Sequence, residues 1–206
     1  MIPVRVFFKK KGKLKYISHL DLMRAVTRAL LRSELPIVYT EGFNPHPKLV
    51  FALPLSIYQE SEYEIFDIAV EDGVSYETVF EKLKTVFPVG FEIFKVAPPV
   101  EKLKNLGFAK YHIELKSSLK AEDIENKLAG ALPVMKKSKS KTEMVDIKPL
   151  IKEYKVNEDG SFDVLVVSMP QTILNPSYVV AALGDGVEDS QITRLCLYTT
   201  DGKVLE

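Results

Sequence analysis

The feature that most constrains the fold is the order in which two kinds of hydrophobic spacing follow one another. Alternating apolar and polar residues predict strands, and apolar residues three and four apart predict helices. Ser18 and Ser75 are suited to cap helices, and Pro36 predicts the end of the first helix. The predicted elements are strands at 4–8 and 13–17, a helix at 18–34, strands at 37–39, 48–53 and 63–70, a helix at 75–87 and a strand at 91–96. This order is typical of the ferredoxin-like split βαβ fold of about 100 residues.

The sequence Ala97-Pro98-Pro99-Val100 interrupts the pattern and predicts a linker, after which a similar order returns. Asn175 and Pro176 predict the start of a last helix, and Gly184 its end. The elements predicted here are a strand at 111–115, a helix at 122–132, a strand at 134–137, a pair at 143–155 and 162–168 joined by a turn at 157–160, the last helix, and a strand at 192–199. We therefore expect an α+β protein with tandem ferredoxin-like domains and antiparallel sheets, at 1–98 and 108–206, with a linker at 99–107. One continuous α+β domain is the alternative.

Charge is distributed unevenly along the chain. The 28 Lys and Arg balance the 28 Asp and Glu, but residues 1–48 hold ten basic and three acidic side chains. This stretch therefore carries a net charge of +7 and the remainder carries −7. A segregated charge favours docking of an anionic partner on the basic part. The alternative is that the basic side chains only keep an exposed face hydrated.

Three arginines follow one line on the predicted first helix. At 100° per residue, Arg24, Arg28 and Arg32 form one exposed stripe, with Asp21 placed to pair with the first two. Arginine matches the geometry of phosphate oxygens, so the stripe, together with Lys13 and Lys15, is a candidate phosphate-binding surface. A solvated face held by pairs of opposite charge is the competing interpretation. A second basic run, at 136–141, is interpreted in the same two ways.

The helix start and the loop after the first helix form the second candidate. His19 is expected on the core side of the first helical turn, next to Ser18 and the free N–H groups that favour anions. In the loop, Pro45 and Pro47 restrict the backbone around His46, and Gly42 permits a positive φ. The polar candidates of the loop are Glu41, Asn44, His46 and Lys48. The alternatives are a buried histidine satisfied by one hydrogen bond and a purely structural turn.

The cysteine content and the lack of long apolar runs bear on disulfides, bound metals and the location of the protein. Cys196 is the single cysteine, which excludes a disulfide framework and a metal cluster held by cysteines alone, and we expect it in the core. We also expect no cofactor and no bound metal ion. No apolar run is long enough for a signal peptide or a membrane span, and we expect a cytoplasmic protein with no membrane contact.

Several of these stretches resemble one family. The residues that carry the resemblance are Arg5-x-Phe7-x-Lys9, Tyr16-Ile17-Ser18-His19-Leu20-Asp21-Leu22-x-Arg24, Leu35-Pro36-x-x-Tyr39-x-Glu41-Gly42-Phe43-Asn44-Pro45-His46-Pro47 and Pro54-Leu55. They are similar to the bacterial "radical-SAM-linked protein" family, a domain of unknown function encoded beside or fused to radical SAM proteins. The resemblance implies an accessory role with a radical SAM protein as partner. Since an iron–sulfur cluster of that kind needs three thiolates, the radical chemistry would belong to the partner.

Three functions follow as hypotheses. The first is an accessory module that presents its basic surface to RNA or another polyanion, without the aromatic sequence signature of RNA recognition motifs and so without expected base stacking. The second is an adaptor that binds the radical SAM subunit. The third is a ribonuclease or metal-site enzyme that uses His19 and His46, although their spacing fits no established signature. We expect the chain not to be an enzyme by itself.

Overall fold

The computed structural model describes residues 1–137 and 142–206 and has mixed α and β structure. Four α-helices and mostly antiparallel strands make up the described part of the chain, which confirms the predicted α+β class. The chain divides into two compact units, here called unit 1 (Met1–Asn105 and Val204–Glu206) and unit 2 (Leu106–Lys203). The boundary falls within the segment 99–107, and the last three residues belong to unit 1. The tandem ferredoxin-like assignment stays a prediction.

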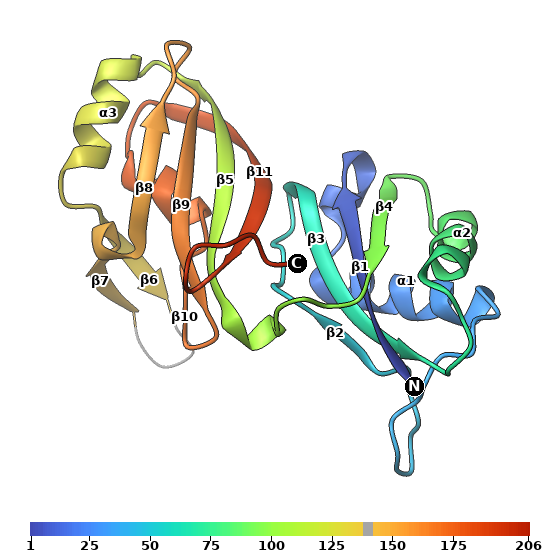
Figure 1. The fold of residues 1–206 in the computed structure, drawn as a ribbon. Coiled ribbons are helices and arrows are strands. Elements are labelled where there is room, and N and C mark those ends of the chain that lie inside the picture. The colour runs from blue at the N-terminus through green and yellow to red at the C-terminus, as the bar shows by residue number, and fades with distance from the viewer. Residues whose placement is uncertain (138–141) are drawn as a thin grey trace. The chain divides into compact units, whose positions relative to one another are not determined.

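Unit 1 has antiparallel strands with two helices on one side of them (Figure 1). Its strands lie in the order β2-β3-β1-β4, and Val6 of β1 pairs with Phe66 of β3 and Val96 of β4. The elements are β1 (Ile2–Lys10), the 3-10 helix η1 (Gly12–Tyr16), α1 (His19–Arg32), β2 (Leu49–Phe51), β3 (Gln59–Val70), α2 (Tyr76–Val86), β4 (Phe91–Ala97) and the 3-10 helix η2 (Leu103–Asn105).

The core of unit 1 follows from the two periodicities. Residues 4–8 of β1 are all buried, and alternate ones, including Val6 and Phe8, form one core cluster with the apolar stripe of α1 that includes Leu22 and Val26. Because strand side chains alternate between faces while helix side chains recur every three or four residues, these two sets meet in one layer. The predicted N-caps are confirmed, since the Ser18 and Ser75 hydroxyls accept hydrogen bonds from the backbone three residues later.

Three predicted strands of unit 1 are wrong or shorter than expected. Residues 13–17 form a 3-10 turn instead of a strand, because Gly12 adopts a φ of +60° that turns the chain out of the strand. Residues 37–39 make only isolated bridges, from Ile37 to Val70 and from Tyr39 to Pro47. Of residues 48–53, only Leu49–Phe51 pairs as a strand.

Unit 2 contains its own antiparallel strands, in which β5 lies between β9 and β11 and β8 pairs with β9. The elements are β5 (Leu106–Ser117), α3 (Ala121–Ala129), β6 (Pro133–Lys137), β7 (Thr142–Asp146), the 3-10 helix η3 (Lys148–Leu150), β8 (Ile151–Val156), β9 (Phe162–Met169), β10 (Thr172–Ile173), α4 (Ser177–Ala182) and β11 (Val187–Thr199). The core includes Ile124 and Leu128 of α3 and Ile113 of β5.

Two predictions for unit 2 need adjustment. The helix predicted to reach 132 ends at Ala129, because Gly130 follows as its cap. The segment predicted at 143–155 divides into β7, η3 and β8, and Pro149 lies within the 3-10 turn. Positions 138–141 of the basic run at 136–141 lie outside the described residues. No helix in the described ranges combines the length and apolar character that a membrane crossing needs.

Candidate functional site

Part of the positive charge of the first 48 residues is matched by acidic side chains of unit 1. Arg5 is buried and binds Asp67 through two hydrogen bonds of 2.7 Å. Lys9 and Lys11 both pair with Glu62. Burial alone would raise the pKa of Glu62, but the two ammonium groups lower it overall, and Glu62 raises the pKa of Lys11 by its hydrogen bond. A segregated charge along the sequence therefore becomes a set of ion pairs across neighbouring strands.

The start of the arginine stripe is engaged by a helix cap. The Ser18 hydroxyl accepts a hydrogen bond from the Asp21 backbone at 3.1 Å and donates to its carboxylate at 2.7 Å. The same carboxylate binds Arg24 at 3.0 Å. The hydrogen bond from Ser18, followed by that from Arg24, lowers the pKa of Asp21. Both members of the ion pair are exposed, so water remains a strong competitor for Arg24.

The other two arginines of the stripe differ in their contacts. Arg32 donates to the carbonyl of Val86 at 2.8 Å, where α2 ends, and so joins the two helices. Arg28 is exposed and forms no ion pair with any residue in the described ranges. Lys13 is exposed on η1, and the Lys15 ammonium lies 5.5 Å from the centre of the Tyr16 ring. The stripe therefore offers less free positive charge than its sequence indicates.

His19 lies on the core side of α1, as predicted. Its ring meets the ring of Phe51 edge-on, with the two centres 5.2 Å apart, and Phe51 packs against the core of unit 1. The aromatic contact gives His19 a packing role at the start of the helix.

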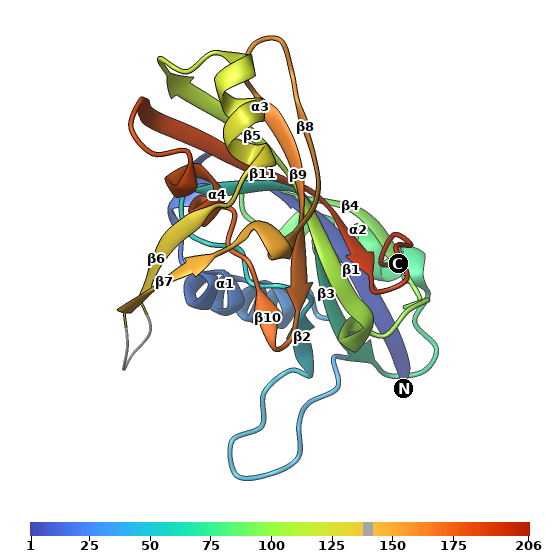
Figure 2. The same ribbon diagram turned by 90° about the vertical axis from the view of Figure 1, so that its left-hand side faces the viewer.

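The predicted loop is built as an extended turn that projects from the strands of unit 1 (Figure 2). The Thr40 N–H donates to the carbonyl of His46 at 2.8 Å, and the His46 N–H donates to the Thr40 hydroxyl at 3.2 Å. The backbone N–H of Lys48 binds the carbonyl of Val38. Glu41, Phe43, Asn44 and His46 are all exposed, and the Phe43 side chain is fully exposed at 108%. The loop thus exposes the Phe43 ring on a backbone that is held by hydrogen bonds between Thr40 and His46.

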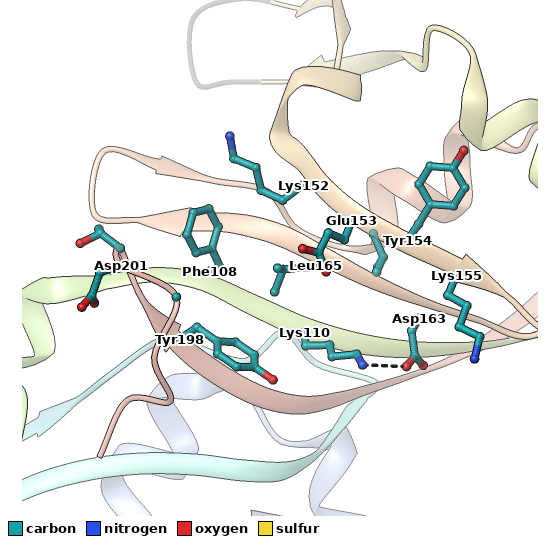
Figure 3. Close-up of a pocket in the computed structure, with 13 residues that line it drawn as sticks. Phe108, Lys110, Lys152, Glu153, Tyr154, Lys155, Asp163, Leu165, Tyr198 and Asp201 are labelled. Carbon is teal, nitrogen blue, oxygen red and sulfur yellow. Dashed lines mark ion pairs between the residues drawn. The ribbon is translucent and has the colours of Figure 1, made fainter.

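Unit 2 contains a groove of about 760 Å³, which the sequence-based candidates do not include (Figure 3). It lies on the partly exposed face of β5, β9 and β11, with β8 and the turn after β11 at its sides. Phe108 of β5 and Tyr198 of β11 are paired in register, so both rings lie on the same face of neighbouring strands. The Lys152 ammonium lies 6.0 Å from the centre of the Phe108 ring.

A polar row crosses the same face next to the aromatic pair. His112 of β5, Asp163 of β9 and Lys155 of β8 are consecutive partners in the strand register. The Nδ1 atom of His112 lies 2.8 Å from Asp163, and the Lys110 ammonium lies 3.0 Å from the other oxygen of the same carboxylate. Burial alone would raise the pKa of Asp163, but the hydrogen bonds from His112 and Lys110 lower it overall. Lys152 and Lys155 form no ion pair with any described residue.

The alternation of β5 explains why this face is polar. Ala109, Tyr111 and Ile113 are buried, and the residues between them point to the other face. Those intervening residues are Phe108, Lys110, His112 and Glu114. Sequence reasoning missed the site because the predicted strand began at 111 and so omitted the aromatic and basic residues before it. The signal was an aromatic or charged side chain at every second position of 108–114.

Cys196 on β11 is half-buried and not in the core as expected, and it is not part of a disulfide. Burial of the neighbouring Tyr198, followed by the Cys196 thiol, raises the pKa of the Tyr198 hydroxyl. Within the described ranges, His, Cys, Asp and Glu side chains form no group of three or more that could hold a metal ion.

Comparisons with known proteins identify a family without a stated activity. A family model described as "Uncharacterized protein conserved in bacteria (DUF2344)" matches residues 4–176. No curated protein matches the chain. Among solved structures, an unknown protein from Galdieria sulphuraria is 15% identical, with 94% of this chain and 98% of that chain covered and a TM-score of 0.30. A heavy metal efflux pump is 6% identical, with 94% of this chain and 28% of that chain covered and a TM-score of 0.28. Neither similarity supports an argument about fold or function.

Proposed function

The chain belongs to the DUF2344 family of uncharacterised bacterial proteins, and we propose that it is an accessory module that binds single-stranded RNA through the groove of unit 2. The observation that carries the proposal is the pair formed by Phe108 and Tyr198 in register on neighbouring strands. Two aromatic rings on one sheet face form a platform on which bases stack, and each stacked base is worth about 1–3 kcal/mol.

The lysines beside the aromatic pair supply the contacts that phosphates need. Lys152 and Lys155 come from β8 at one side of the groove, and neither is held in an ion pair with a described residue. Lys110 is held by Asp163 and is therefore less free to contact a phosphate. Glu153 and Asp201 line the groove together with Asp163, so its three lysines are balanced by three carboxylates. We expect stacking to supply most of the affinity and the two free lysines to supply the rest.

The proposal includes the tandem ferredoxin-like assignment for both units. In unit 1 the strands lie in the order β4-β1-β3-β2, and in unit 2 the corresponding order is β11-β5-β9-β8. In each unit two helices alternate with these strands, and β6 and β7 form an additional pair in unit 2. An antiparallel sheet with helices on one side leaves the other face free for a ligand, which supports the placement of the RNA on β5 and β11.

The test is equilibrium binding of a labelled 2′-O-methyl RNA of about ten nucleotides, a hydrolysis-resistant form that covers a groove of this kind. Replacing Phe108 or Tyr198 by Ala should raise Kd by about 5- to 150-fold, which corresponds to the loss of about 1–3 kcal/mol of stacking. Tyr178→Ala is the matched control, because Tyr178 is also half-buried and lies in unit 2 but not in the groove. Unchanged binding in both groove variants, with intact folding, would contradict the proposal.

A second candidate function is an adaptor that binds another protein through the loop of unit 1. The observation that favours it is the fully exposed Phe43 ring on a loop whose backbone is tied between Thr40 and His46. Exposed aromatic rings are frequent anchors of protein interfaces. The partner to be tested is the radical SAM protein that the family resemblance implies. Phe43→Ser should abolish its co-purification with that partner and leave RNA affinity unchanged.

A further inference from the structure

We propose that unit 2 also cleaves the RNA bound in its groove, with His112, whose partner Asp163 lines the groove, as the general base, an inference that rests on the proposed RNA-binding function. His112 and Asp163 are paired in register on β5 and β9, and the Nδ1 atom lies 2.8 Å from the carboxylate. Because a carboxylate can only accept this hydrogen bond, Nδ1 carries the proton and Nε2 is left as the basic atom. A carboxylate that orients a histidine base is the arrangement found in Ser-His-Asp triads.

The surroundings suit a proton acceptor. The Nε2 atom of His112 lies 3.8 Å from the Glu114 carboxylate, so the imidazolium that forms on proton uptake would lie between two carboxylates. The side chains of His112 and Asp163 are 29% and 27% exposed, which keeps them accessible to a ligand but fixed by the strands. Lys110, held at 3.0 Å by Asp163, fixes the second oxygen of that carboxylate.

Lys155 is the third member of the row that begins with His112 and Asp163, and it is the candidate to contact the phosphate of the RNA. It pairs in register with Asp163, lines the groove and forms no ion pair with any described residue. An ammonium group in this position can bind a phosphate oxygen and donate a proton to the leaving oxygen. The row thus brings a base, an orienting carboxylate and a cationic acid together from three neighbouring strands.

The reaction that these groups support uses the RNA's own 2′-hydroxyl as the nucleophile. Nε2 of His112 takes the proton of the 2′-hydroxyl while the bond from O2′ to phosphorus forms. The bond from phosphorus to O5′ breaks, and the leaving O5′ takes a proton from Lys155. The products are a 2′,3′-cyclic phosphate and a 5′-hydroxyl end, and solvent then returns a proton to the lysine and removes one from the histidine. No oxidant, reductant or further reactant is consumed.

The experiment incubates the full chain with a single-stranded RNA and with DNA and 2′-O-methyl RNA of the same sequence. We expect cleavage of the RNA alone, with 2′,3′-cyclic phosphate and 5′-hydroxyl ends. His112→Gln should slow cleavage by at least about 100-fold, the scale of general-base catalysis, while Kd for 2′-O-methyl RNA changes less than about twofold. Asp163→Asn tests a positioning residue and should lower kcat with little change in KM.

Glu188→Gln serves as the control variant, because Glu188 is an exposed carboxylate on β11 that lies outside the groove. This variant should cleave the RNA at the same rate as the unaltered protein. Binding without cleavage would overturn the inference and leave the proposed function in place. Absence of binding would overturn both. Cleavage of DNA, cleavage that leaves a 5′-phosphate, or equal cleavage by His112→Gln prepared in the same way would also overturn it.

Discussion

The salt dependence of RNA binding distinguishes the groove of unit 2 from the arginine stripe of unit 1. Each contact between a cation and a phosphate of a single strand lowers log K by about 0.7 per decade of salt. The groove offers two lysines without an ion pair among the described residues, Lys152 and Lys155. Raising the salt from about 50 to about 200 mM should therefore weaken binding by about sevenfold.

The alternative surface predicts a much steeper dependence. If the five basic side chains of η1 and α1, at positions 13, 15, 24, 28 and 32, held the phosphates, the same change in salt would weaken binding by about 130-fold. The assay is fluorescence anisotropy of the labelled 2′-O-methyl RNA at several salt concentrations. Replacing both groove lysines by Gln should flatten the dependence, whereas Arg28→Gln should leave it unchanged. A dependence near 130-fold that Arg28→Gln reduces would refute the placement of RNA in the groove.

Two further predictions concern stability. Arg32→Ala removes the hydrogen bond to the carbonyl of Val86 and should lower the free energy of unfolding by about 0.5–1.5 kcal/mol in urea titrations, whereas Arg28→Ala should not change it. Hydrogen bonds from two backbone N–H groups lower the pKa of Asp146, so its contribution to stability is complete above the pKa of the unfolded state and is lost as the pH falls through the lower folded-state value. Asp146→Asn should therefore destabilise the protein at neutral pH and much less in acid, and an equal loss at both pH values would contradict the assignment.

The local features of the fold were predictable from the sequence because their causes are local. A serine three residues before the Asp21 N–H, and a stripe of apolar residues at helical spacing, were sufficient to place α1. The failure at 13–17 has an equally local cause, since alternation there resembles a strand but Gly12 turns the chain. Alternation alone does not reveal a change in backbone direction.

The charge pattern shows where sequence reasoning reaches its limit. Lys9 and Lys11 meet Glu62 because β1 and β3 are neighbours, although some fifty residues separate them in the chain. A net charge calculated over a stretch of sequence therefore overestimates the charge that a ligand meets, whenever the partner strand carries the opposite sign. The sequence correctly predicted that the three arginines of α1 form one exposed stripe. It did not predict the hydrogen bond from Arg32 to the carbonyl of Val86, because that bond depends on how α1 and α2 pack.

The groove illustrates the same limit for a site made by strand register. Phe108 and Tyr198 are separated by most of unit 2 in sequence, and each by itself is an ordinary strand residue. Their adjacency requires the pairing of β5 with β11, including a register shift between Arg194 and Cys196 that changes which residues of β11 share the face of Phe108. Without that shift, Tyr198 would lie opposite a different residue and point to the other face. A binding platform of this kind is therefore a property of the register, and a bulge of one residue decides whether it exists.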